Sequence, residues 1–241
     1  MILFGTLLNA AAILLCGAFA LATQRRPSVR LQTAIKGVLG VLTIIIGLRL
    51  TVSNFNGGWT HIGKQLLIIL LSLSLGRLLG RSLRLQKGSN RLGKYAKRKI
   101  EEATKHPRFT DGFITASLLF CVAPLAFLGA IQDGLSNNWQ ALAIKAVMDG
   151  LTTVAFISTF GWSVIAAVVP VVAFQGTITL AARYLAEHML GLDLIGAINA
   201  TSGLLVFCVG LVVLDLKKIE LTDYLPSVVV APFIAWLWPP W

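Results

Sequence analysis

Two charged residues lie inside an apolar stretch of this sequence. The segment Ala141–Phe160 is long enough to cross a membrane, and it contains Lys145 and Asp149. Counted from Trp139 at about 1.5 Å per residue, Asp149 lies about 15 Å deep, near the middle of a hydrocarbon core about 30 Å thick. A carboxylate at that depth can bind a proton or a cation, and a neighbouring ammonium can act as its counter-charge or contact an anion.

The spacing of these two residues leaves two interpretations open. Lys145 precedes Asp149 by four residues, so their side chains share one face of a helix. A charge at the bilayer centre costs from about 2.5 to more than 10 kcal/mol, so it normally faces protein or water and has a partner. In the first interpretation the two residues are structural: they form an ion pair between packed helices, or Lys145 extends alone to the membrane interface. In the second they form a transport or ion-coupling site.

Other polar residues accompany this pair in the apolar segments. Asp133 follows the apolar run Gly112–Ile131, where it binds a proton or cation, caps a turn or lies in interfacial water. Neutral polar side chains taken singly fit hydrogen bonds between helices. The predicted ligand- or ion-binding residues are Asp149, Lys145, Asp133, Gln132, Gln175, Asn9, Thr115 and Asn199, and no catalytic residue is predicted.

The composition is that of a membrane protein. The 241 residues are 56% hydrophobic and 13% charged, and the mean hydropathy is +0.79. The net charge of +11 lies between apolar runs, which favours membrane orientation over a nucleic-acid partner. The three cysteines, Cys16, Cys121 and Cys208, have no metal-ligand spacing, and no phosphate-binding loop is present, so neither a cofactor, a metal nor an enzymatic activity is expected.

The apolar runs predict an all-α polytopic membrane protein with seven or eight transmembrane helices. Trp162–Arg183 contains Pro170 and Gln175-Gly176, so it is either one kinked helix or two half-helices. Leu225–Trp238 is short and contains proline, so it is either a distorted span or a re-entrant segment. The expected spans are Ile2–Thr23, Leu31–Val52, Leu66–Leu85, Gly112–Ile131, Ala141–Phe160, Trp162–Arg183, Leu194–Leu214 and Leu225–Trp238.

A basic segment, Gln86–Arg108, predicts the orientation. Its excess of lysine and arginine places it in the cytoplasm, together with the basic loop Gln24–Arg30. Leu92, Tyr95, Lys99 and Glu102 do not form a clean apolar face, so the segment is expected to be a solvated short helix on anionic lipid.

The two ends of the chain resemble each other. Without gaps, Gly40 aligns with Gly203 and Gly47 with Gly210, together with four apolar positions. An odd number of intervening spans turns the second copy upside down, which predicts an inverted three-plus-three repeat. The single domain would then comprise a first repeat (1–85), the basic loop (86–108), a central helix pair (109–160) and a second repeat (161–241). A chance match of glycine-rich spans, or a parallel repeat if Trp162–Arg183 crosses twice, are the alternatives.

Several motifs also resemble a known family. Gly5-Thr6-Leu7-Leu8-Asn9, the run Gly112–Val122, Gln132-Asp133-Gly134-Leu135, Lys145 with Asp149-Gly150, and Phe174-Gln175-Gly176 resemble the YqgA-like family of uncharacterised bacterial inner-membrane proteins. The likeness covers nearly the whole chain. The resemblance implies a polytopic fold in the bacterial inner (plasma) membrane and a role in transport, but it names no substrate. Ala123-Pro124 departs from the glycine-containing pair expected there, which could alter a bend in the fourth span.

Two functions follow from these observations. The first is a secondary transporter or ion-coupled carrier of a small ion or small molecule, using the charged residues Asp133, Lys145 and Asp149. The second is a non-transporting scaffold or regulator that acts through the basic segment on anionic lipid or a partner. Glycine-rich helix faces further predict a homo-oligomer in the lipid bilayer.

Overall fold

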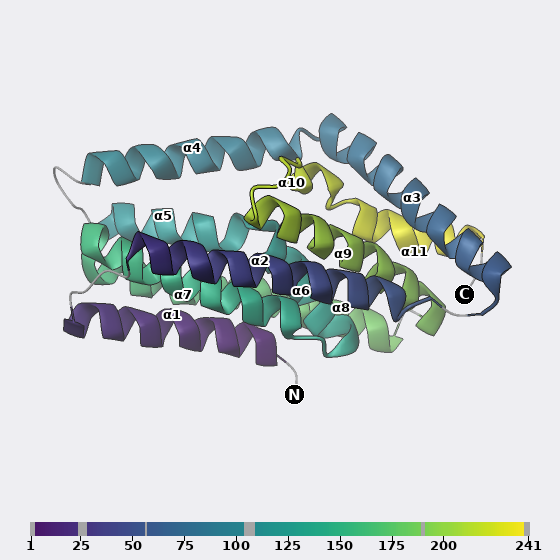
Figure 1. Ribbon diagram of the computed structural model, residues 1–241, viewed down its shortest axis with the longest axis horizontal. Coiled ribbons are helices and arrows are strands. Elements are labelled where there is room, and N and C mark those ends of the chain that lie inside the picture. The colour runs from purple at the N-terminus through teal and green to yellow at the C-terminus, as the bar shows by residue number, and fades with distance from the viewer. Residues whose placement is uncertain (1–2, 24–27, 56, 104–108, 189–190, 239–241) are drawn as a thin grey trace. The chain divides into compact units, whose positions relative to one another are not determined.

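A computed structural model describes residues 3–23, 28–55, 57–103, 109–188 and 191–238, which are helical almost throughout and contain no strand (Figure 1). This confirms the all-helical prediction. The helices are α1 (Phe4–Thr23), α2 (Val29–Val52), α3 (Trp59–Ser82), α4 (Leu85–Ala103), α5 (Phe109–Val122), α6 (Pro124–Ser136), α7 (Gln140–Phe160), the 3-10 helix η1 (Gly161–Ala167), α8 (Val168–His188), α9 (Leu192–Val213), α10 (Leu221–Tyr224) and α11 (Ser227–Leu237).

By length and composition, five helical stretches in the described residues could cross a membrane. They are α1, α2, α3, the run from α7 through α8, and α9, and the bent pair α5 and α6 would make a sixth. The segment covering α10 and α11 is apolar but shorter. Many large apolar side chains on these helices are exposed, as expected for contact with lipid.

The chain divides into two compact units. Unit 1 comprises Met1–Val38 and Ser89–Ala181, and unit 2 comprises Leu39–Gly88 and Ala182–Trp241. Unit 1 holds α1, α5, α6, α7 and η1 with most of α4 and α8, whereas unit 2 holds α3, α9, α10 and α11 with most of α2.

The core of unit 1 forms where α1 lies along α7 (Figure 1). One face of α1 carries mostly small buried residues, among them Gly5, Ala10, Gly17 and Ala20, which let the two helices approach closely. Towards the other end of α7, α5 and η1 add larger apolar side chains. The buried cluster there includes Ile13, Ala116, Phe120, Ile157, Val164 and Val171.

The fourth predicted span is broken into α5 and α6. The two helices meet at an angle of 58° at Ala123. Pro124 has no N–H to donate and restricts the residue before it, and Ala123 accordingly has an extended ψ of 130°. The break lies at the Ala123-Pro124 pair, where the sequence predicted an altered bend.

The interruption predicted within Trp162–Arg183 is not found in α8, and the chain turns instead at the predicted boundary between the spans Ala141–Phe160 and Trp162–Arg183. The chain turns at Gly161, whose φ of +68° suits glycine, and continues as η1 before α8 begins. From there, α8 is unbroken through Pro170 and Gln175-Gly176. Pro170 lies in the first turn of α8, where its missing N–H has no partner to lose, so the half-helix alternative with a break at Gln175 is wrong.

The basic segment forms a helix, as predicted, but one face is packed and not solvated. Ala96 of α4 is buried, and Ile100 packs against the core cluster of unit 1. Leu92 lines a groove with Leu118 and Leu119 of α5. Leu92, Ala96 and Ile100 recur every four residues and so share one helix face. This apolar face was not evident in the sequence because alanine carries little hydrophobic signal. Arg25, Arg26, Lys105 and Arg108 lie outside the described residues.

The opposite face of α4 is basic. Its exposed cations follow helical spacing, so they form one stripe that points away from the packed face. We call this the basic stripe; it consists of Lys87, Arg91, Lys94 and Arg98. Its concave outer surface also includes Lys97 and Glu101.

In unit 2, α2 and α9 cross on glycines. A methyl group added to Gly203 would lie 2.8 Å from the carbonyl oxygen of Gly47, and one added to Gly210 would lie 2.9 Å from that of Gly40. The backbones are therefore in direct contact, and Thr51 Oγ1 donates to the carbonyl of Ala200 at 3.2 Å beside the crossing. We call Gly40, Gly47, Gly203 and Gly210 the glycine seam.

A second glycine contact in unit 2 joins α3 to α10 and α11. Gly76 faces the backbone of Ser227, and Gly80 faces that of Asp223. This gives the weak Gly76/Gly80 spacing in the sequence a definite packing partner. Where α4 begins, the backbone N–H of Gln86 donates to Asp223 at 2.8 Å, while the Gln86 side chain accepts from the N–H of Thr222 at 3.1 Å.

Candidate functional site

A buried ion pair lies on α7. Lys145 Nζ contacts the carboxylate of Asp149 one turn further along the helix. Lys145 is 2% exposed and Asp149 is 7% exposed. The ammonium also lies 5.8 Å from the ring centroid of Phe120 on α5, which adds a favourable electrostatic contact. The i, i+4 spacing thus gives the predicted pairing, and the snorkelling interpretation of Lys145 is wrong.

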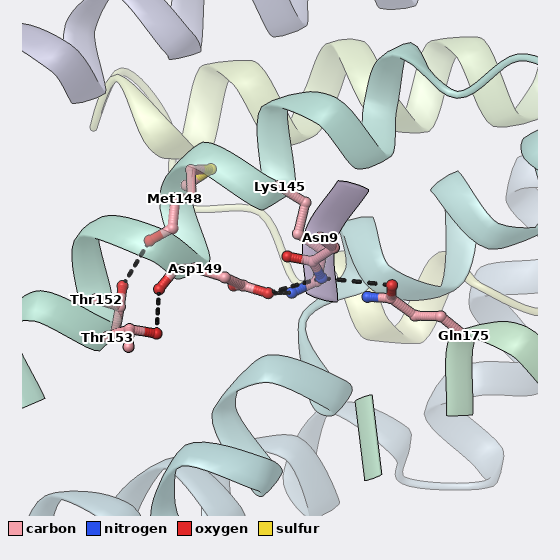
Figure 2. A network of polar contacts seen from close by, with 7 residues as sticks. All are labelled: Asn9, Lys145, Met148, Asp149, Thr152, Thr153 and Gln175. Atoms are coloured by element: carbon pink, nitrogen blue, oxygen red, sulfur yellow. Dashed lines mark hydrogen bonds and ion pairs between the residues drawn. The ribbon is translucent and has the colours of Figure 1, made fainter. Parts of the chain in front are cut away.

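Two amides extend this pair across three helices. Asn9 Nδ2 of α1 donates to Asp149 Oδ2 at 3.0 Å and to Gln175 Oε1 of α8 at 3.4 Å. Figure 2 shows the Asn9 side chain between the Asp149 carboxylate and Gln175. Asn9 and Gln175 are both fully buried. We call Lys145, Asp149, Asn9 and Gln175 the polar network.

Small residues allow the network to form. A methyl group added to Gly150 would lie 2.8 Å from Cys16 Sγ on α1, and one added to Gly5 would lie 2.6 Å from Leu142 Cδ1 on α7. These glycines bring α1 close enough to α7 for the short Asn9 side chain to reach Asp149. On α7 itself, Thr153 Oγ1 donates to the carbonyl of Asp149 at 2.8 Å and so is occupied by its own helix (Figure 2).

Asp133 performs a different task from Asp149. Its Oδ2 accepts the backbone N–H of Gly5 at 3.1 Å, in the first turn of α1. The first N–H groups of a helix have no partner within the helix, and a carboxylate there also interacts favourably with the helix dipole. Asp133 therefore caps the start of α1 from α6.

Substitution of Asp133 tests this capping role. Asp133→Ala removes the acceptor and is expected to destabilise the protein by about 1 kcal/mol, whereas Asp133→Asn keeps an acceptor oxygen and should lose less. Thermal unfolding of the purified variants measures the difference. Equal losses in both variants would show that the negative charge, and not the hydrogen bond, is what matters.

Several buried polar atoms near these groups have no hydrogen-bond partner within the described residues. On α1 and α8 they are Asn9 Oδ1, Gln175 Nε2 and the hydroxyl of Thr6; on α5 and α6 they are the hydroxyl of Thr115, both amide atoms of Gln132 and Asp133 Oδ1. A buried polar atom without a partner is costly, so each is a position for a bound water or ligand. Gln132 and Thr115 lie in unit 1 with the polar network and are fully buried.

Asn199 is not part of this group. It is buried on α9 and belongs to unit 2. Two groups that contact the site residues were not predicted from the sequence. They are the backbone N–H of Gly5, which bonds to Asp133, and the ring of Phe120, which lies beside Lys145. A signal for the first was present, because the Gly5-Thr6 pair lies one helical turn before Asn9. Nothing marked Phe120 among the other apolar residues of its segment.

Comparisons with known proteins identify a family of unknown function. Residues 4–236 match the family described as "Protein of unknown function (DUF554)". The chain is 32% identical over 172 residues to the "Uncharacterized membrane protein YdfK" of Bacillus subtilis, covering 71% of each chain. It is 26% identical over 241 residues to the "Uncharacterized protein YqgA" of Escherichia coli, covering 98% of each. No solved structure matches.

Proposed function

We propose a function for this chain, which belongs to the DUF554 family of unknown function, on the basis of its polar network. The chain is an ion-coupled secondary transporter in which Asp149 takes up and releases the coupling ion. The observation that carries the proposal is a buried Lys145–Asp149 pair joined to amides of two other helices. An intramembrane charge pair whose neighbouring amides keep unsatisfied atoms, Asn9 Oδ1 and Gln175 Nε2, is typical of ion pathways. No chemical step and no cofactor is proposed.

The geometry favours a proton over a metal cation as the coupling ion. A metal cation needs several oxygen ligands, whereas the side-chain groups that contact the Asp149 carboxylate are an ammonium and an amide N–H. Lys145 would repel a second cation. A proton needs only the carboxylate, and its uptake leaves Lys145 charged and available to another ligand.

Proton uptake into liposomes under an imposed pH gradient tests the proposal. Wild-type protein is expected to take up protons, and Asp149→Asn, which cannot be protonated there, should fall to the level of protein-free liposomes. Asp215→Asn is the matched control, because Asp215 is exposed and its φ of +55° also suits asparagine. Equal uptake by wild type and a correctly folded Asp149→Asn variant would refute a coupling role for Asp149.

The second candidate function is a scaffold or regulator acting through α4. The basic stripe supports it, since cations exposed on one helix face attract anionic lipid or an acidic partner. Neutralising Lys94, Lys97, Arg98 and Lys99 together separates the two functions. A transporter should retain proton uptake in this variant. Loss of uptake here, with retention in Asp149→Asn, would favour the basic segment.

We propose an inverted repeat within the membrane fold. The sequence alignment equates Gly40 with Gly203 and Gly47 with Gly210. In the structure the contacts are exchanged, because Gly47 faces Gly203 and Gly40 faces Gly210. A two-fold axis between two copies of one repeat produces this exchange of partners, which supports the inverted arrangement. The seam is filled within one chain, so the homo-oligomer predicted from sequence would have to use other surfaces.

We also propose that α7 and α8 cross the membrane separately. Asp149 and Gln175 lie on opposite sides of Gly161 in the sequence, and both bond to Asn9, so the chain must reverse between them. With the α5 and α6 pair counted once, this supports seven crossings, and α10 with α11 would make eight. In a bacterial inner membrane, the exposed cations of residues 86–108 would then face the cytoplasm.

A further inference from the structure

Hydrogen-bond donors surround the carboxylate of Asp149. Lys145 Nζ and Asn9 Nδ2 both contact its Oδ2 atom. Asn9 Nδ2 also donates to Gln175 Oε1, which orients that amide and leaves Gln175 Nε2 as a buried donor without a partner. Three hydrogen-bond donors from three helices, Lys145 Nζ, Asn9 Nδ2 and Gln175 Nε2, thus belong to one connected set of side chains. The Asp149 carboxylate occupies two of these donors (Figure 2).

The charges at this place balance only while Asp149 is ionised. Once Asp149 is protonated, the charge of Lys145 remains, and it lies on a face of α7 that is closed to solvent. Among the described residues, the other titratable groups close to the network are Cys16 of α1, whose sulfur lies against Gly150, and Cys121 of α5, and a thiol offers no charge to compensate an ammonium. Asp133 of α6 is engaged at the start of α1. A buried ammonium without a counter-charge is unfavourable, so protonation of Asp149 creates a need for an anion.

We propose that the polar network binds a small monovalent carboxylate when Asp149 is protonated. The ligand takes the place of the Asp149 carboxylate at Lys145 Nζ and Asn9 Nδ2 and accepts a hydrogen bond from Gln175 Nε2. This inference rests on the proposed function and makes the transporter a symporter of one proton with one anion. The proton goes to Asp149, the anion pairs with Lys145, and the loaded site is neutral overall.

Direct binding of radiolabelled acetate to the purified protein in detergent tests the ligand class. Wild-type protein is expected to bind acetate saturably and more tightly as the pH becomes mildly acidic. Lys145→Gln should bind at least about tenfold more weakly, because the ligand loses its counter-charge. Asp149→Asn imitates the protonated carboxyl and should bind acetate equally at all pH values tested.

Two controls keep the result interpretable. Lys94→Gln removes an exposed cation of the basic stripe and should bind as the wild type does. The double variant Lys145→Gln/Asp149→Asn has no charge in the polar network and should stay folded without binding acetate. If folded Asp149→Asn binds no acetate, or if radiolabelled methylammonium binds to the wild type in place of acetate, the inference is overturned.

The outcome is separate from that of the proton-uptake experiment. Binding is measured without a membrane gradient, so acetate binding that follows the expected pattern supports the ligand class even if no proton flux is found. Proton flux without any acetate binding would support the transporter proposal and overturn the inference that the ligand is a small carboxylate. A pH-independent affinity in the wild type would also overturn it, since protonation of Asp149 is what opens the site.

Discussion

Lys145→Gln is expected to destabilise the protein by about 3–5 kcal/mol, the usual loss when one partner of a buried ion pair is removed. Asp149 is 7% exposed, and among the described residues the substitution leaves its carboxylate with Asn9 Nδ2 as the remaining side-chain donor. The free energy of unfolding, measured by denaturant titration of the purified protein in mixed micelles, gives the loss directly.

The double variant supplies the decisive comparison. In Lys145→Gln/Asp149→Asn two neutral amides replace the two charges at nearly the same volume, and they can bond to each other and to Asn9. Replacing a buried pair by neutral groups is often tolerated, so most of the stability should return. A double variant as unstable as Lys145→Gln would mean that the side chain of Lys145 acts through packing and not through its charge.

The second large effect is expected in the glycine seam. Gly47→Val places branched carbons against the backbone of Phe207 and the carbonyl oxygen of Gly203, neither of which can rotate away. Overpacking against a side chain costs about 1–3 kcal/mol, and contact with backbone should reach the upper end of that range or exceed it. Thermal unfolding of the purified variant, followed by loss of monodisperse protein, measures the effect.

Gly37→Ala on the same helix is the matched control. An added methyl there meets no atom within 4 Å. Alanine is also the better helix former, so this variant should unfold at the same temperature as the wild type or higher. Tolerance of Gly47→Val would show that α2 and α9 can separate without loss, and it would remove the main support for the repeat.

Features that depend on neighbours in sequence were the ones that could be predicted. The pairing of Lys145 with Asp149 follows from the helical repeat, because residues four apart share a face. The break at Ala123-Pro124 follows from the chemistry of proline. Family membership followed from motifs such as Gln132-Asp133-Gly134-Leu135 and is confirmed by the match over residues 4–236.

Features that depend on which helices meet could not be predicted. Asn9, Asp149 and Gln175 are far apart in sequence, and an amide in an apolar run does not indicate its partner. The packed face of α4 was missed because its buried positions include the small residue Ala96, which carries little hydrophobic signal. Asn199 seemed equivalent to Asn9 in composition, but it lies in the other unit.

The partners of α1 have a consequence for how the protein is made. The N–H of Gly5 bonds to the carboxylate of Asp133, which lies 128 residues later in the sequence. The amide of Asn9 bonds to Asp149 and Gln175, which lie 140 and 166 residues later. While the ribosome is still synthesising α2 to α5, the first helix enters the bilayer with a buried amide unsatisfied. Its final position can be reached only when α8 has left the ribosome, so unit 1 must assemble late in translation, from both ends of its sequence at once.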